Sequence, residues 1–269
     1  MTRNGINTYW QVIKNTWDEG LTYRFSFVIY RARSLLQLLT MYFLWQAIIP
    51  IGTTAFGYSQ KYLLTYIIGA SLVSSLVLSS RSQNIASDIN EGVISNFLIR
   101  PVNYFAYWFA RDIGDKALNI IFSVGEISFF VLVFHPPIIL QTNIFILGIS
   151  FLSAVFGMIL YFYFSVFIGL FGFWSNETWG PRFIFYQVLS FLAGSLFPLD
   201  ILPKAVFNVF QYLPFTYLMY FPLKLYLGQI TTEFVIKGFV ITFIWILIMH
   251  VATEFLWKKG LRAYTAQGR

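Results

Sequence analysis

Long apolar stretches separated by short polar segments dominate this chain of 269 residues. A helix needs about 20 consecutive apolar residues to cross the hydrocarbon core of a membrane. Six stretches approach or exceed this length and are predicted spans: residues 35–56, 62–79, 115–134, 143–173, 183–197 and 234–257. The pattern predicts an all-α polytopic membrane protein, built as a single transmembrane domain over residues 1–269.

Two of the predicted spans depart from the usual length. Residues 143–173 are longer than a straight crossing requires, so a tilt or a kink is expected. Residues 183–197 are too short to cross comfortably, and an apolar but proline-interrupted segment, residues 199–228, follows them. Broken backbone at membrane depth must be covered by protein or line a cavity. This segment is therefore predicted to form short re-entrant or external helices.

The chain before the first predicted span has an amphipathic helical pattern. Its apolar face carries Ile6, Tyr9, Trp10, Ile13 and Trp17. Tryptophan and tyrosine favour the head-group zone of a membrane. Residues 1–33 are therefore predicted to contain a helix that lies in the membrane interface.

A second amphipathic segment, SDINEGVISNFLIRPVNYFAYW at residues 87–108, lies between the second and third predicted spans. Apolar residues recur in steps of four from Ile85 to Phe97, while polar residues lie mostly opposite. Pro101 disfavours helical geometry at the preceding residue and is predicted to end the helix there. The pattern predicts one helix over residues 87–101, an elbow, and a second helical segment leading into the third span.

Composition and charge agree with membrane insertion. Hydrophobic residues make up 58% of the chain and charged residues only 11%, whereas charge in soluble domains is about a quarter. The net charge of +7 comes from scattered residues, so contact with lipid head groups is expected and nucleic-acid binding is not.

The distribution of basic residues predicts the orientation, because cytoplasmic segments are enriched in Lys and Arg. With six spans and both termini in the cytoplasm, only four of the 18 Lys and Arg residues would lie outside: Lys61, Lys204, Lys224 and Lys237. The chain is therefore predicted to be a multi-pass protein of the inner, cytoplasmic membrane.

The sequence offers few groups for catalysis or for metal binding. It has no cysteine, no phosphate-binding loop ending in Gly-Lys-Ser or Gly-Lys-Thr, and two histidines, His135 and His250, predicted near opposite leaflets. We expect no catalytic residue, no metal site and no bound cofactor in this chain. Glu126 is the acid placed deepest in a predicted span. A polar interhelical contact is the favoured interpretation, and a proton relay is the alternative.

Three features together resemble the ABC-2 family of permeases, the membrane subunits of ABC exporters. They are the predicted interfacial helix, the segment INEGVISNFLIRPVNYFAYW after the second span, and the segment SFLAGSLFPLDILPKAVFNVFQYLPFTYLMYFP around the fifth. The last combines a short span, a Gly-x-x-x-Pro turn and a Leu-Pro-Phe-Thr-Tyr step. The resemblance covers nearly the whole chain and rests on the order and spacing of degenerate motifs.

The resemblance implies that the loop between the second and third spans holds a coupling helix, seated in a cleft of a separate ATP-binding subunit. Carried over by position, the contact residues are Asp88, Asn90, Glu91, Gly92, Ser95, Arg100 and Pro101. It also implies that the fifth span and the helices after it line or close the outer end of the pathway. The corresponding gate region comprises Gly194, Phe197, Pro198, Pro203 and Pro214.

The resemblance further implies a complex of two permease chains, identical or homologous, and two ATP-binding subunits that hold ATP and Mg²⁺. The leading hypothesis is a non-catalytic permease half that exports an amphiphilic, lipid-linked, drug-like or peptide substrate. The alternative is an ATP-independent secondary carrier or channel that uses Glu126. Co-purification of an ATPase would favour the first hypothesis, and ion-driven transport by the chain alone would favour the second.

Overall fold

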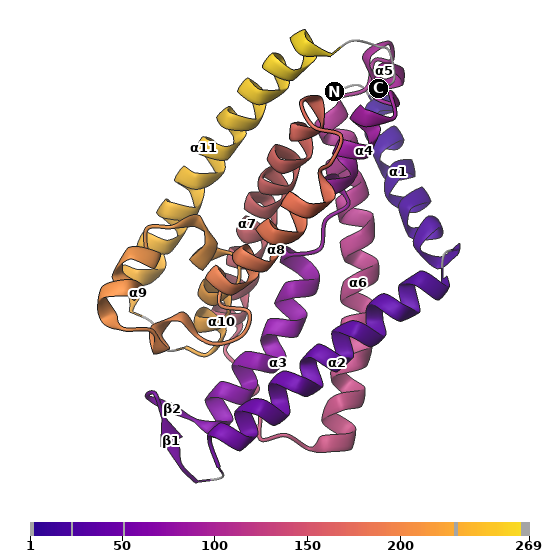
Figure 1. Cartoon of the computed structure of the whole chain (residues 1–269). Coiled ribbons are helices and arrows are strands. Elements are labelled where there is room, and N and C mark those ends of the chain that lie inside the picture. The colour runs from indigo at the N-terminus through magenta and orange to yellow at the C-terminus, as the bar shows by residue number, and fades with distance from the viewer. Residues whose placement is uncertain (1–2, 23, 51, 229–230, 265–269) are drawn as a thin grey trace.

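The computed structural model describes residues 3–22, 24–50, 52–228 and 231–264, and these are mostly helical (Figure 1). The longer helices are α1 (Arg3–Thr22), α2 (Arg24–Ile48), α3 (Gln60–Val77), α6 (Tyr104–Phe134), α7 (Ile144–Gly169), α8 (Trp179–Leu192) and α11 (Thr232–Ala263). The shorter ones are η1 (Ser82–Asn84), α4 (Ile85–Asn90), α5 (Ser95–Leu98), η2 (Leu170–Phe173), η3 (Leu199–Ile201), α9 (Lys204–Phe210), η4 (Pro214–Tyr217) and α10 (Tyr220–Tyr226). Strands β1 (Thr54–Ala55) and β2 (Tyr58–Ser59) form an antiparallel hairpin, with Thr54 opposite Ser59.

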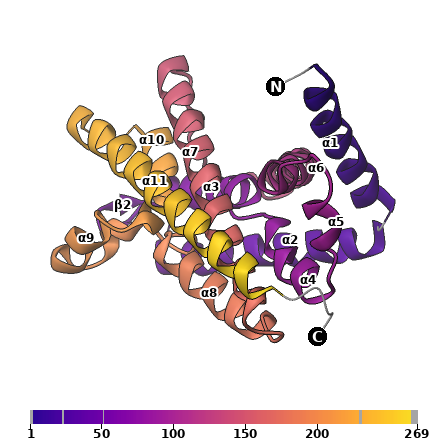
Figure 2. The ribbon, with the colours of Figure 1, turned by 90° about the horizontal axis from the view of Figure 1, so that it is seen from above.

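The helices form an elongated bundle with two distinct ends (Figure 1). The start of α1, the end of α11, α4 and α5 lie at one end. We call it the inner end, because the charge pattern predicts that it is cytoplasmic. The hairpin, α9 and α10 lie toward the other end, the outer end. Seen from above, α1 lies at one edge of the bundle, whereas α11 crosses the bundle diagonally (Figure 2).

Three helical segments of the described residues are each long and apolar enough to cross a membrane: α6, α7 continued by η2, and α11. The pair formed by α3 and residues Ser82–Asn90 would be a fourth, bent by 49°. Helices α2 and α8, at the first and fifth predicted spans, are outside this group. The structure confirms an all-α membrane protein, whereas the number of six spans stays a prediction.

Helix α6 is longer than the third predicted span. It begins at Tyr104, where the side chain of Asn103 accepts a hydrogen bond from the Ala106 amide at 2.9 Å and caps the helix. It ends at Phe134, before His135 adopts a left-handed φ of 44°. The helical segment expected after the elbow is therefore not separate from the third span but forms its first turns.

The centre of the bundle is α3, whose residues Leu63, Leu64 and Tyr66 are at most 1% exposed. They belong to a cluster with buried side chains of α2, α7, α8 and α10. Small residues let α10 and η4 approach closely: a Cβ at Gly69 would lie 2.9 Å from Leu223, and one at Gly157 would lie 3.1 Å from a backbone oxygen. Such small-residue contacts are the usual means of helix association in membranes.

Helix α1 packs along the first turns of α6. The contacts run in the same direction on both helices, from Tyr9 near Asn103 to Gly20 near Leu118. The closest approach is at Gly114, where a Cβ would lie 2.7 Å from a backbone oxygen of α1. Trp10 of the predicted apolar face is 57% exposed. Its placement at the membrane interface stays a prediction.

Candidate functional site

The segment predicted to be the coupling helix is broken rather than continuous. Helix α4 ends at Asn90, and α5 begins only at Ser95. Between them Gly92 adopts a left-handed φ of 76°, a conformation that glycine reaches without a steric penalty and that commonly ends helices. The prediction of one helix over residues 87–101 is therefore wrong, and the segment forms two short helices joined by a tight turn.

The apolar face of this segment is buried against the bundle. Ile85 and Ile94 are 0% exposed, and they pack in a cluster with aromatic and aliphatic residues of α6 and α7. A Cβ at Gly172 would lie 2.8 Å from the Cα of Ala86, so α4 touches η2 backbone to backbone. Helix α4 is thus packed on protein rather than free on the membrane surface.

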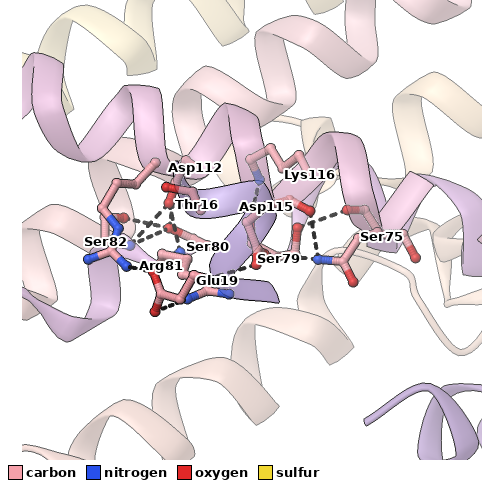
Figure 3. A network of polar contacts seen from close by, with 12 residues as sticks. Thr16, Glu19, Ser75, Ser79, Ser80, Arg81, Ser82, Asp112, Asp115 and Lys116 are labelled. Atoms are coloured by element: carbon pink, nitrogen blue, oxygen red, sulfur yellow. Dashed lines mark hydrogen bonds and ion pairs between the residues drawn. The ribbon is translucent and has the colours of Figure 1, made fainter. Parts of the chain in front are cut away.

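A pair of charged residues on α6 holds the break between α3 and η1 (Figure 3). Asp112 is 0% exposed, and its carboxylate accepts hydrogen bonds from the amides of Arg81 at 2.7 Å and Ser82 at 3.1 Å. It also accepts one from the Ser80 hydroxyl at 2.6 Å. Asp112 therefore binds the first amides of the helical segment that follows the break, where helix dipoles favour a negative charge.

The other member of the pair is Lys116, which is 3% exposed and lies one turn further along α6. Its ammonium donates to the carbonyl oxygens of Ser79 and Val77 at the end of α3, where the dipole favours a positive charge. We call Asp112 and Lys116 the α6 clamp. The α6 clamp fixes both sides of the break that leads into α4.

Ion pairs connect the same region to α1 (Figure 3). The guanidinium of Arg81 donates to Glu19 at 2.9 Å and to Asp115 at 2.8 Å. Glu19 also pairs with Arg111 of α6. The break after α3 is therefore bound to two helices, α1 and α6, through both backbone and side-chain contacts.

The residues assigned to the ATPase contact fall into two groups. Three have their polar atoms bound within the chain: Asp88 accepts from Tyr104 at 3.1 Å, Asn90 donates to the Asn176 carbonyl at 3.1 Å, and Ser95 bonds to Tyr264 at 2.9 Å. Glu91, Arg100 and Pro101 are exposed, although the Glu91 carboxylate also accepts from the Ser87 hydroxyl at 2.6 Å, and Gly92 forms the turn. Only the exposed group is directly available to another subunit.

Two further features of this surface were missed from the sequence. Ile99 is 83% exposed beside Arg100. The connection between α7 and α8 also reaches the turn, and a pocket of about 300 Å³ lies between them, lined by Ser87, Asn90, Glu91, Asn176, Glu177, Thr178, Trp179 and Arg182. No periodicity in the sequence signals that these loops meet.

At the outer end, the carbonyl groups that end α8 are bound by three other elements. Ala193 accepts from the Tyr220 amide at 3.0 Å, Gly194 from the Tyr66 hydroxyl at 2.6 Å, and Leu196 from the Trp45 indole at 3.0 Å. The helix ends here because Gly194 has a φ of 79°. α8 is thereby joined to α2, α3 and α10.

The remaining residues of the predicted gate lie around this junction. Phe197 packs edge-on against Phe191 with ring centroids 5.5 Å apart, and Pro198 and Pro203 precede η3 and α9. Pro214 is buried at the first position of η4.

An ion pair braces the same end of the bundle. Lys224 lies 3.0 Å from Asp200, which also accepts from the Tyr58 hydroxyl at 2.7 Å. The ion pair thus joins the hairpin to the segment that carries the residues of the predicted gate, whose role as a gate stays a prediction.

Glu126 lies within an interhelical ion pair. The Nε atom of Arg31 on α2 donates to its carboxylate at 2.6 Å, and the same guanidinium donates to Ser123 at 2.9 Å. Ser123 in turn contacts Ser75 of α3. The carboxylate therefore has a basic partner on a neighbouring helix. Among the described residues, no group of three or more His, Cys, Asp or Glu is arranged to hold a metal ion.

A larger cavity lies between α2, α3, α6 and α8 and has a volume of about 960 Å³. Its walls carry Glu19, Arg33, Arg81, Asp115 and Arg182 together with serines of α3, including Ser74 and Ser75. Aromatic residues also line the cavity, together with amide side chains such as Gln187; the aromatic residues are Phe27, Tyr30, Tyr161, Trp179, Phe183, Tyr186 and Phe191. The cavity reaches from the ion pairs near the inner end to Leu196 beside the gate residues.

No curated protein matches the sequence. A family model described as "ABC-2 family transporter protein" matches residues 35–268, which is most of the chain and includes the segment predicted to be the coupling helix and the residues of the predicted gate. The chain therefore belongs to the ABC-2 transporter family and is a multi-pass membrane permease of that type.

Proposed function

We propose that the chain is the permease half of an exporter that moves an amphiphilic substrate outward across the cytoplasmic membrane. ATP hydrolysis in a separate ATP-binding subunit, present in two copies, drives the cycle, and ATP and Mg²⁺ are held there. A second permease chain, identical or homologous, completes the pathway. The chain itself is non-catalytic.

The observation that carries this proposal is the way in which α4 is attached. Its apolar face is buried against α6, α7 and η2, while Ser87 and Glu91 of the same segment are exposed. A short element that is rigidly packed on one side and polar on the other is suited to transmit a push. A helix floating on lipid would not need backbone contact with η2.

The α6 clamp supports a specific route for that push. Displacement of α4 would exert a force on the backbone around Arg81 and Ser82. Asp112 and Lys116 of α6 are hydrogen-bonded to the backbone on the two sides of this break, so the force would reach α6. The ion pair between Arg81 and Glu19 would transmit the same displacement to α1. We infer that α1, α3 and α6 respond together, so that a small movement at the inner end changes the cavity between α2, α3, α6 and α8.

The surface proposed to contact the ATP-binding subunit includes fewer of the seven residues that the family resemblance assigned to this contact. It comprises the exposed residues Glu91, Arg100 and Pro101, extended by Ile99 and by the α7–α8 connection at Glu177. Asp88, Asn90 and Ser95 would act indirectly, by holding the shape of the turn.

Affinity purification of the tagged chain in mild detergent tests the proposal. We expect an ATP-binding subunit to be recovered with it, and Glu91→Arg to lower that recovery and the stimulated ATPase rate. Asp18→Arg is the matched control, because it reverses an exposed acidic charge on α1 away from the turn. Recovery of no ATP-binding partner under several extraction conditions, together with ion-driven uptake by the purified chain in vesicles, would favour a secondary carrier instead.

A further inference from the structure

The charges that line the large cavity do not cancel. Both of its acids are occupied: Glu19 pairs with Arg81 and Arg111, and Asp115 pairs with Arg81. Within the part of the chain that the structure describes, neither Arg33 nor Arg182 forms an ion pair with a carboxylate. Two positive charges on the cavity wall are therefore left for a ligand.

Arg33 and Arg182 line the same cavity from two different helices, α2 and α8. Arg182 and Tyr186 are four residues apart and lie on the same face of α8. One guanidinium nitrogen of Arg182 donates to the Gln83 carbonyl, which fixes the side chain at the cavity edge.

The wall beyond this point changes from charged to aromatic. Along α8, the cavity face runs from Arg182 through Phe183 and Tyr186 to Phe191, a distance of about 14 Å at the helical rise of about 1.5 Å per residue. Phe27 of α2 contributes to the same lining. The cavity thus has a cationic inner part and an aromatic part toward the outer end, where Gln187 and Ser190 also line the wall.

We propose that this cavity binds an anionic amphiphile, with a phosphate or carboxylate head at Arg33 and Arg182 and an apolar chain along α8. Guanidinium groups bind such heads through charge-assisted, often bidentate hydrogen bonds. The inference rests on the proposed function and narrows its substrate class. The ligand is either a cargo molecule or an anionic lipid of the surrounding membrane, since both carry the same chemistry.

The test uses the purified full chain in phosphatidylcholine nanodiscs without an ATPase, so that it does not depend on the coupling mechanism. Dodecyl phosphate is titrated into these discs and, as a blank, into empty discs, and binding is measured by calorimetry. Neutral dodecyl maltoside, which carries only the apolar chain, and inorganic phosphate, which carries only the anionic head, are partial ligands and are titrated in the same way. We expect saturable binding of dodecyl phosphate, and weaker binding of both partial ligands. Arg33→Gln and Arg182→Gln should each weaken binding about tenfold, the typical effect of one charge-assisted bond.

Two controls separate a site from a general charge effect. Arg262→Gln removes an exposed positive charge at the inner end of α11, away from the cavity, and should leave the affinity unchanged. The double variant Arg33→Lys/Arg182→Lys keeps both charges and should retain most of the binding. Equal affinity for dodecyl phosphate and dodecyl maltoside would overturn the proposal, as would equal losses in Arg262→Gln and Arg33→Gln.

Repeating the titration in phosphatidylglycerol nanodiscs distinguishes the two sources. Strong competition by phosphatidylglycerol would assign the site to membrane lipid, and undiminished binding would assign it to cargo. Both results support an anionic amphiphile. Failure of dodecyl phosphate to bind, while an ATP-binding subunit still co-purifies, would reject this inference and leave the proposed function standing.

Discussion

Asp112 and Lys116 lie one turn apart on α6 and bind opposite sides of the same chain break, Asp112 the amides that follow it and Lys116 the carbonyls that precede it. Each charge meets the helix end whose dipole it complements. Two adjacent turns of one helix thereby replace the hydrogen bonds that a continuous α3–α4 helix would have made. The bend after α3 is held by α6 rather than by its own backbone.

Replacing Lys116 with Met should destabilise the bend. The methionine fills a similar volume but leaves the carbonyls of Ser79 and Val77 without their buried donor, at a cost of about 2 kcal/mol. We expect a lower unfolding temperature in detergent and a loss of ATPase stimulation. Lys258→Met on the exposed end of α11 is the matched control. Equal thermal stability of the two variants would show that the α6 clamp does not hold the bend.

Replacing Gly172 with Ala should separate α4 from η2. The new Cβ would lie 2.8 Å from the Cα of Ala86, so one backbone has to shift, at a typical cost of about 1–3 kcal/mol. Stimulated ATPase activity should fall more than binding of the ATP-binding subunit. Gly148→Ala in α7 has open space around its Cβ, and it should be neutral or slightly stabilising. A Gly172→Ala complex with unchanged coupling would refute transmission through this contact.

Loss of the Tyr66 hydroxyl should loosen the outer end. Tyr66→Phe removes the 2.6 Å hydrogen bond to the Gly194 carbonyl without changing the packing of the ring. Because the native chain has no cysteine, a single Ser74→Cys in the cavity reports access. An impermeant maleimide added outside should label it slowly in the parent and faster with Tyr66→Phe. Tyr62→Phe serves as the control, and equal labelling of all three would argue against a closed gate.

The same cysteine-free background tests the six-span prediction. Single cysteines at Lys61 and Lys237 should be labelled from outside, and those at Glu177 and Lys258 only after the membrane is permeabilised. The decisive pair is Glu177 and Lys237, which lie on either side of the short α8. Labelling of both from the same side would mean that α8 does not cross.

Much of the coupling segment could be predicted, because the spacing of Ile85, Ile89 and Phe97 reports a buried helical face. The break at Gly92 was missed, although the sequence Asn-Glu-Gly carries the signal of a helix end. The role of Asp112 and Lys116 could not be read from spacing. Two charges four residues apart usually indicate a solvated helix face, and only the fold brings the end of α3 against them.

At the outer end, too, part of the structure could be predicted from the sequence and part could not. The prolines of residues 199–228 correctly predicted several short helices instead of one, and the structure has η3, α9, η4 and α10 there. No sequence pattern shows which distant group donates a hydrogen bond to each backbone carbonyl at the end of α8. Trp45, Tyr66 and Tyr220 lie far from Gly194 in the sequence, and their bonds depend on how four elements meet.

The hydrogen bonds at the end of α8 also affect the resting state of the protein, when no ATP is hydrolysed. Opening the outer end would break hydrogen bonds to α2, α3 and α10 at once, and three bonds of about 1 kcal/mol each correspond to a population of the open form roughly a hundredfold below that of the closed form. Since the donors come from three separate helices, a thermal fluctuation of one helix releases only one bond. In the proposed transport cycle, these hydrogen bonds would therefore favour the closed form of the outer end between rounds of ATP hydrolysis.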